Sequence, residues 1–234
     1  MRISRAEMLL LCLVVASCVG PLTKEQTSHI HSVGVISLLG DRISLSHVRL
    51  FDNKNDKVIV VESQFDMIAE NTVIECAKAV DPTLQFTKIT IPKQPLMDKL
   101  YSGLAALYNA TMSEIRVELL EWVKQNPVDA IVIVREVNRQ VPARGPSQYF
   151  AGLGLHQFLG ARPLVQVSLG IVVWDARTLE QMTAADFAQG GGEYPESIEK
   201  VGDQLGAGQR IPLVPILQRL LQTGLCGSVK KVNL

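Results

Sequence analysis

The sequence predicts an α/β protein with some α+β character, in which helices pack on a mixed β-sheet. Three observations support this class. Runs rich in β-branched residues alternate with segments whose apolar residues recur at helical spacing. The segment VDAIVIVREV (128–137) is apolar on both faces, as a central strand covered on both sides would be. The segment LVQVSLGIVVWDARTLEQM (164–182) alternates apolar and polar residues, which indicates a long half-buried antiparallel strand that turns into a returning one.

The chain begins with an apolar run, Met8 to Ala16, that is too short to cross a bilayer as a helix, since a span needs about 20 residues. Arg2 and Arg5 precede the run and small residues close it, which is the order of a secretory signal peptide. The run ends at Val15-Ala16-Ser17-Cys18, which resembles the lipobox of bacterial lipoproteins. Simple secretion with cleavage nearby and a buried N-terminal helix are the alternatives.

The lipobox resemblance implies three things about the mature protein. Residues 1–17 would be removed as a signal peptide, the sulfur of Cys18 would carry diacylglycerol, and its new amino terminus would be acylated, with palmitate for instance. Several acyl chains anchor a protein stably to a membrane. Val19 follows the cysteine where an inner-membrane lipoprotein of enteric bacteria has Asp, so we expect the outer membrane, facing the periplasm.

The charge balance excludes one class of partner, and the cysteine content limits the possible disulfides. Without residues 1–17, which hold two Arg and one Glu, the chain keeps 21 basic and 22 acidic residues. This near-neutral balance argues against a nucleic-acid binder, which needs a basic face. Only Cys76 and Cys226 then remain as thiols in an oxidising compartment, where they either form a disulfide or stay as two separate buried thiols.

The first part of the mature chain predicts a tether and then strands. Residues 18–28 are mostly polar with a Gly-Pro pair, and we expect a tether. One domain should follow over residues 29–234. Its start predicts a β-meander of three strands, over 29–39, 43–51 and 57–61, because turn residues separate these runs.

The middle of the chain shows helical spacing. We expect a helix over 63–80, opened by Ser63 and Asp66 as an N-cap pair and ended by Asp81-Pro82. A strand over 84–91 and a helical run of leucines over 96–107 should follow. Further helices are predicted from a Thr111/Glu114 capping box to Asn126 and over 212–222.

The segment 141–163 holds three prolines and four glycines, which predicts a Gly/Pro-rich excursion between strands. Its apolar and aromatic residues either pack on the protein's own sheet or form a contact surface for a partner protein or lipid, because aromatic residues with Arg are enriched at interface centres. The partner-binding candidates are Tyr149, Phe150, Phe158, Arg144 and Arg162.

The stretch VSLGIVVWDARTLEQM, with VDAIVIV as the preceding strand, resembles the α/β domain of a group of envelope lipoproteins. That group comprises the penicillin-binding-protein activator lipoproteins, the curli secretion lipoprotein and the N-terminal domain of the Tol-Pal translocation protein. Its habit is a strand, an Asp-x-x-Thr turn and a returning strand. The resemblance implies a non-enzymatic envelope protein that acts as an adaptor, regulator or assembly component for another envelope protein, or that assembles with itself.

No residue pattern supports a catalytic site, a cofactor or a metal. LLGDRIS (38–44) resembles the Gly-Asp-Ser block of lipolytic hydrolases, but Arg42 stands where the nucleophile should be. His29 and His31, two apart on an expected strand, lack a carboxylate at ligand spacing. The alternative function is a small-ligand binder or hydrolase with a pocket near the 141–163 loop.

Overall fold

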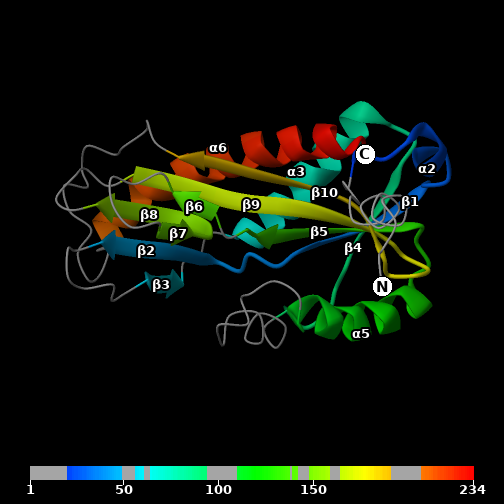
Figure 1. Cartoon of the computed structure of the whole chain (residues 1–234), viewed down its shortest axis with the longest axis horizontal. Helices are drawn as coiled ribbons and strands as arrows, with labels where there is room; N and C mark the ends of the chain where they lie inside the picture. Colours follow the sequence, from blue (N-terminus) through cyan, green and yellow to red (C-terminus); the bar gives the residue numbers. More distant parts are fainter. Residues whose placement is uncertain are drawn as a thin grey trace, which may run out of the picture.

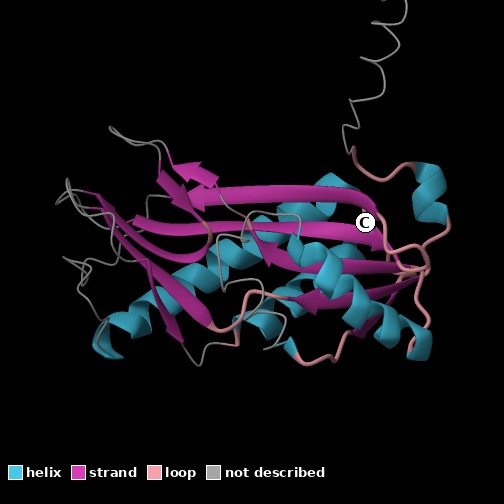
Figure 2. Ribbon diagram, turned by 60° about the horizontal axis from the view of Figure 1, so that its bottom comes forward, coloured by secondary structure: helices cyan, strands magenta, loops and turns pink. Residues whose placement is uncertain are grey.

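The structure is a computed structural model of the whole chain, and it describes residues 20–48, 56–60, 64–93, 110–137, 139–141, 148–158, 164–190 and 207–234. Figures 1 and 2 show their arrangement as a twisted sheet with helices packed on it. The helices are α2 (Lys24–Ser28), α3 (Phe65–Val80), α5 (Ala110–Gln125) and α6 (Ala207–Val232). The strands are β1 (Ser32–Ser37), β2 (Arg42–Val48), β3 (Asp56–Val60), β4 (Gln85–Lys88), β5 (Ala130–Glu136), β6 (Arg139–Val141), β7 (Gln148–Phe150), β8 (Gly152–Phe158), β9 (Leu164–Asp175) and β10 (Gln181–Gly190).

Within the described ranges the main sheet has eight strands of mixed direction, which confirms the predicted α/β class. Seven strands follow the order β3-β2-β8-β9-β5-β1-β4, β10 pairs with β9, and β6 and β7 form a separate small hairpin. β1 is parallel to β4 and β5, and β2 is parallel to β8. β9 is antiparallel to β5, β8 and β10.

The long strand β9 holds two half-sheets together. β10 pairs with residues 166–174 of β9. The other edge of β9 pairs first with β8, over residues 164–168, and then with β5, over residues 169–175. β8 therefore continues the line of β5, and β2 continues the line of β1, because these strands pair in the same succession. The middle of the sheet thus contains two interrupted lines of strands, β5 followed by β8 and β1 followed by β2. They lie beside one unbroken hairpin, β9–β10.

Helices cover the half-sheet around β5 on both faces, so its core has two layers. On one face α3 and α6 lie side by side and bury apolar side chains against the sheet, among them Phe65, Val73, Leu217 and Leu225. On the other face α5 packs Ile115, Leu119 and Trp122 against Ile131, Ile133 and Trp174. Alternate residues of β5 enter the two cores, which confirms the prediction of a central strand covered on both sides.

The N-terminal strands do not form the expected meander. β2 and β3 are an antiparallel hairpin, as predicted. β1 and β2, however, are joined end to end by residues 38–41 and share no register. Gly40 has the left-handed φ of 64° that favours glycine, but the chain continues along the sheet rather than folding back, so the hairpin expected at Gly40-Asp41 was wrong.

The segment 141–163 is not only an excursion, because it supplies β7 and β8. β8 lies inside the main sheet between β2 and β9. Its glycines, which the sequence analysis interpreted as loop residues, are required by close packing. A Cβ on Gly154 would overlap the carbonyl oxygen of Ser44, and Gly152 has φ of 78° with the Glu136 carboxylate beside it.

The helix predicted over 63–80 begins at Phe65, and its cap differs from the expected one. The N-cap residue Gln64 is left-handed, with φ of 54°, and makes no side-chain cap hydrogen bond. Asp66 instead accepts hydrogen bonds from the backbone of Leu39 and Gly40. The last helix is longer than predicted, since α6 spans Ala207–Val232. The predicted helix over 96–107 lies outside the described residues.

Candidate functional site

Cys18 lies outside the described residues, but the chain is fixed to the domain from Gly20 onward. The carbonyl oxygen of Gly20 accepts a hydrogen bond from Thr183 Oγ1 of β10 (2.7 Å). The Leu22 N–H donates to the Val232 carbonyl (3.0 Å), and Asn233 Nδ2 donates to the Leu22 carbonyl (3.1 Å). The Leu22 side chain is buried. Residues 20–28, expected as part of a tether, are therefore part of the folded domain.

The helix α2 explains why this polar segment is ordered. Thr23 Oγ1 accepts from the Gln26 N–H (3.2 Å), and Gln26 Oε1 accepts from the Thr23 N–H (2.9 Å), so the two residues form a capping box. His29 caps the other end of this helix and His31 precedes β1. The two histidines therefore do not share one strand, and the expected strand geometry was wrong.

α2 lies at one end of the domain, together with the turn between β9 and β10 and the C-terminus (Figure 1). We call this end, made of residues 20–28, 175–179 and 230–234, the terminal face. In the turn, Asp175 Oδ1 accepts from the N–H groups of Arg177 (2.7 Å) and Thr178 (3.1 Å). Leu179 closes the turn with φ of 53° and a buried side chain. The Asp-x-x-Thr turn predicted from the sequence is thus confirmed, with β10 as the returning strand.

Asp129, which directly precedes β5, accepts hydrogen bonds from the start of β1 next to this turn. Its Oδ2 accepts hydrogen bonds from the His31 N–H (3.0 Å), the Ser32 N–H (3.0 Å) and Ser32 Oγ (2.9 Å). Burial by itself would raise the pKa of the Asp129 carboxyl, but these hydrogen bonds together hold its pKa below the ordinary value. Arg177, 3.8 Å from Oδ1, has a largely exposed side chain, so this ion pair is weak.

A shallow cavity of about 240 Å³ opens beside the terminal face. The ends of α2, α3 and α6 surround it. The lining residues are Thr27, Ile30, Val80, Asp81, Leu84, Asn233 and Leu234. Val80, the last residue of α3, is 47% exposed.

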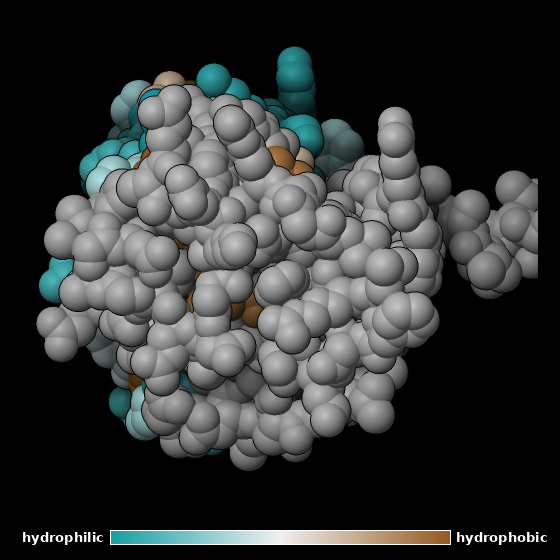
Figure 3. Space-filling model, turned by 90° about the vertical axis from the view of Figure 1, so that its left-hand side faces the viewer, coloured by the Kyte–Doolittle hydropathy of each residue, from teal (hydrophilic) through white to brown (hydrophobic). Residues whose placement is uncertain are grey.

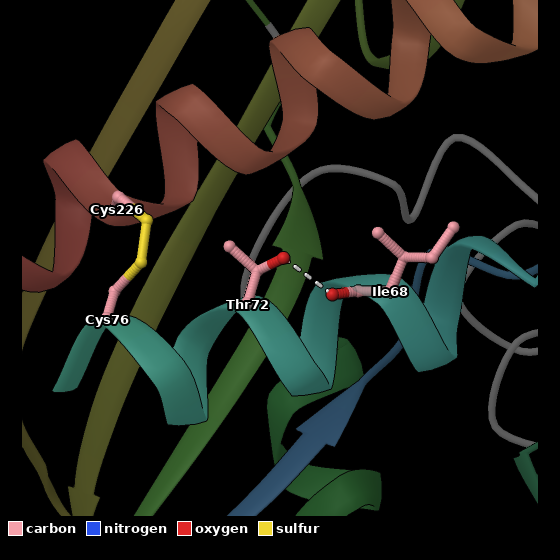
Figure 4. Close-up of a disulfide and its surroundings, with 4 residues drawn as sticks. All are labelled: Ile68, Thr72, Cys76 and Cys226. Atoms are coloured by element: carbon pink, nitrogen blue, oxygen red, sulfur yellow. Dashed lines mark hydrogen bonds between the residues drawn. A yellow bond between two sulfur atoms is a disulfide. The ribbon is translucent and has the colours of Figure 1, made fainter. Parts of the chain in front are cut away.

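Cys76 of α3 and Cys226 of α6 are joined by a disulfide in the structure (Figure 4). Their Cα atoms are 5.3 Å apart, and 150 positions separate them in the sequence. On the same helix as Cys76, the Thr72 hydroxyl donates to the Ile68 carbonyl (2.7 Å), so this buried hydroxyl has a partner. The disulfide clamps together the two helices that cover one face of the sheet.

A cluster of charged residues stands where β1 ends and α3 begins. Lys93 Nζ lies 2.6 Å from Glu70 Oε1 and 3.6 Å from Asp66 Oδ2. Glu70 Oε1 also accepts from the Ser37 N–H (3.1 Å). Asp41 Oδ1, in the turn after β1, accepts a hydrogen bond from the Phe65 N–H at the start of α3 (2.7 Å). In return, Asp66 of α3 accepts one from the Leu39 N–H in that turn, so the two segments are joined by reciprocal hydrogen bonds.

The hydrogen bond from the Phe65 N–H gives Asp41 a structural role. Burial raises the pKa of Asp41; the Phe65 hydrogen bond and Lys93 oppose the change, and the carboxylate of Asp66 adds to it. Asp41 is the aspartate of LLGDRIS, the block that resembles a hydrolase motif, and here it holds a helix terminus. Sequence reasoning missed the cluster, whose only local signal was an acidic residue in the first turn of the helix.

A polar row crosses the sheet near the 141–163 segment. Gly170 of β9 pairs with Arg135 of β5 on one side and with Asp186 of β10 on the other. A Cβ on Gly170 would overlap Asp186 Oδ1, so the carboxylate lies over the glycine. Asp186 Oδ1 and Gln166 Oε1 are buried, and neither has a hydrogen-bond partner among the described residues.

The five partner-binding candidates lie only partly within the described chain. Tyr149 and Phe150 belong to β7 and Phe158 ends β8, but their side chains are not described. Arg144 and Arg162 lie outside the described residues. Figure 3 views the molecule from the end opposite the terminal face; apolar residues are visible in its middle and hydrophilic ones at its rim. We call this opposite end, where β2 and β8 finish, the far end.

Two searches of the described residues were negative. They contain no group of three or more His, Cys, Asp or Glu placed to hold a metal ion. No helix in the described ranges is long and apolar enough to cross a membrane.

Comparison with known proteins finds no matching family model and no matching curated sequence. Solved structures give weak similarity. The PelC dodecamer of Paraburkholderia phytofirmans aligns over 88% of this chain and 89% of that chain, at 9% identity and a TM-score of 0.37. Protein XCC0632 of Xanthomonas campestris aligns over 92% and 90%, at 8% identity and a TM-score of 0.38. Lipoprotein GNA1162 of Neisseria meningitidis aligns over 84% and 99%, at 11% identity and a TM-score of 0.31. These scores are too low to carry an argument about function, so we infer function from the residues of this chain.

Proposed function

We propose that this protein is a lipid-anchored envelope lipoprotein, held in the outer membrane through Cys18 and facing the periplasm. It acts without catalysis, as an adaptor, regulator or assembly component for another envelope protein. It needs no cofactor, and its partners are the membrane and a protein.

The disulfide between Cys76 and Cys226 is the observation that carries the proposed location. Disulfides persist in oxidising compartments such as the bacterial periplasm, and they are rare in the cytosol, where thiols are kept reduced. An exported chain agrees with the signal peptide expected over residues 1–17.

The arrangement around β9 supports the adaptor role. The strand, Asp-x-x-Thr turn and returning strand on which the resemblance to envelope lipoproteins rests are β9, residues 175–178 and β10. The outer face of α5 also presents Val117 and Leu120, one turn apart, which are 64% and 40% exposed. Apolar side chains exposed next to each other favour contact with a partner.

Lipidation is tested by feeding cells an alkyne analogue of palmitate and detecting the label on the protein. We expect label on the wild type and none on Cys18→Ala, which should also leave the membrane pellet. Cys12→Ala is the matched control and should label like the wild type, because Cys12 lies in the removed peptide. Equal labelling or sedimentation of wild type and Cys18→Ala would disprove the anchor.

The adaptor role is tested by crosslinking in the intact envelope. A photoreactive amino acid is placed at Val117, at Phe150 or at Glu25 of the terminal face, one position at a time. We expect one stoichiometric protein adduct from Val117 or Phe150 and none from Glu25. No protein adduct from any position would contradict the proposal.

The alternative function, a small-ligand binder or hydrolase, has one observation in its favour. In the polar row at Gly170, the buried Asp186 Oδ1 has no hydrogen-bond partner among the described residues. A ligand there would have to supply hydrogen-bond donors. Thermal stabilisation of the wild type, but not of Asp186→Ala, by a compound from a small-molecule library would favour this alternative.

A further inference from the structure

We propose that the terminal face rests directly on the bilayer surface, so that the domain stands upright and its far end points away from the membrane. This inference depends on the proposed lipidation of Cys18. It concerns how the anchored domain is oriented, which lipidation alone would leave free.

The first step of the argument is the length of free chain. Gly20 and Leu22 are hydrogen-bonded to Thr183, Val232 and Asn233, so the domain begins at Gly20. Between the lipidated Cys18 and Gly20 there is only Val19. Two residue steps span at most about 7 Å even when fully extended. A flexible linker would let the domain tumble, whereas this spacer holds the terminal face within the headgroup region.

The second step is the chemistry of that face. Its exposed cations are Lys24, Arg177, Lys230 and Lys231, and they stand beside the exposed acids Glu25 and Glu180. The cations can contact lipid phosphates. The surface is mixed in sign, however, so the tether rather than charge must hold it on the bilayer.

Apolar contact adds to this arrangement. Val80 is 47% exposed at the rim of the cavity formed with Ile30, Leu84 and Leu234. An exposed apolar side chain at the membrane interface gains free energy by leaving water. The bilayer is therefore the occupant that fits this end of the domain.

The third step is the height of the far end. β9 runs from Leu164, at the far end, to Asp175, at the terminal face. Eleven residue steps at about 3.3 Å each give a height of about 36 Å. β8 is antiparallel to β9, and Phe158 lies two residues beyond His156, which pairs with Leu164. The segment expected to contact a partner thus stands well clear of the membrane.

The chain contains its own reporter for this orientation. Its two tryptophans both lie near the terminal face: Trp174 directly precedes the turn, and Trp122 is in the last turn of α5. The experiment uses the chain from Cys18 onward. The Cys18 thiol adds to a maleimide-headgroup lipid in vesicles that contain a dansyl-headgroup lipid, and the bonded Cys76 and Cys226 do not react. Resonance energy transfer from tryptophan to dansyl is then measured.

The matched control carries a spacer of about ten Gly/Ser residues between Val19 and Gly20, which has a mean length of about 18 Å. It leaves every residue of the domain unchanged, and its melting curve should equal that of the wild type. We expect the directly coupled chain to show at least about twofold more transfer than the spacer variant, by the tether lengths given above. Transfer should change little when salt is raised, because the face has mixed charge.

Equal transfer from the two chains would overturn the orientation. Strong transfer from a chain whose Cys18 is blocked before mixing would overturn the role given to the short tether, since the face would then bind the bilayer without it. Failure of palmitate labelling in cells would disprove the anchor but not the geometry measured on vesicles, so the two proposals can fail separately.

Discussion

Asp129 shows how one side chain can join segments that are distant in sequence. One carboxylate oxygen receives three hydrogen bonds from His31 and Ser32, almost a hundred positions away, and this pairing aligns the start of β1 beside β5. Hydrogen bonds to a charged group are stronger than those between neutral groups. The charge of Asp129 should therefore contribute to stability.

We predict that Asp129→Asn lowers the free energy of unfolding by about 1.5–3 kcal/mol at neutral pH. Because the folded-state pKa of Asp129 lies below its unfolded value, its contribution is present above the unfolded value and is lost as the pH falls through the folded one. The difference between wild type and variant should thus shrink in acid. Urea unfolding at neutral pH and at successively lower pH measures this.

Glu121→Gln serves as the control for Asp129, since Glu121 pairs with Lys124 on the exposed face of α5. Its effect should stay below about 0.5 kcal/mol. A difference for Asp129→Asn that is the same at every pH would contradict the role of the charge.

At this scale the sequence predicted residue types better than their partners. The sequence left Cys76 and Cys226 either as a disulfide or as two separate buried thiols, and the structure joins them. The partners of Asp41 and Asp66 could not be predicted, because each carboxylate accepts a hydrogen bond from a backbone segment more than twenty positions away. Local pattern reasoning assigned Asp66 to its own helix, and tertiary contacts overrode that assignment.

At the scale of the elements, α6 packs closely on the sheet. Four of its leucines, Leu213, Leu217, Leu221 and Leu225, recur at every fourth position and form one buried stripe. Gly224 lies against the ring of Phe187 on β10, and a Cβ there would overlap ring atoms. At Gly227, one turn later, an added Cβ would meet no atom within 4 Å.

We predict opposite effects for the same substitution at these two glycines. Gly224→Ala should destabilise the protein by about 1–3 kcal/mol, because the buried ring must shift. Gly227→Ala should stabilise it by about 0.5–1 kcal/mol through helix propensity alone. Thermal melts of the two variants test this pair. Equal shifts of the same sign would mean that α6 does not approach β10 as described.

The positions of α3, α5, β5 and β9 and of the middle of α6 followed from periodicity, because each pattern is long and its neighbours are apolar. The turn at residues 175–178 predicted the returning strand β10, whereas α2 was expected to be a tether. The position of β8 did not follow from periodicity, because Gly152 and Gly154 are as typical of loops as of strands that approach another backbone closely. The end-to-end succession of β1 and β2 also left no local signal. A four-residue connection fits a hairpin equally well, and only the distant strands β5 and β8 decide between the two.

For the whole molecule, the disulfide closes a loop of 150 positions and joins the two helices of one layer. Closing so long a loop restricts the unfolded chain and is worth about 2–5 kcal/mol. We predict that Cys76→Ala combined with Cys226→Ala lowers the melting temperature by several degrees and keeps the native circular dichroism spectrum.

Melting curves measured with and without a reductant provide the control for this prediction. The reductant should lower the melting temperature of the wild type toward that of the double variant and leave the double variant unchanged. A wild type that binds a thiol reagent at both cysteines without reductant would show that the bond is absent in solution.

The interrupted strands have a mechanical consequence. The break between β5 and β8 and the break between β1 and β2 lie side by side, next to residues 168 and 169 of β9. A seam therefore crosses the sheet, and among the described elements the β9–β10 hairpin and the helix α6 bridge it without interruption. A pull applied at the far end reaches the terminal face through those elements, whereas the remaining strands transmit it only as far as the seam.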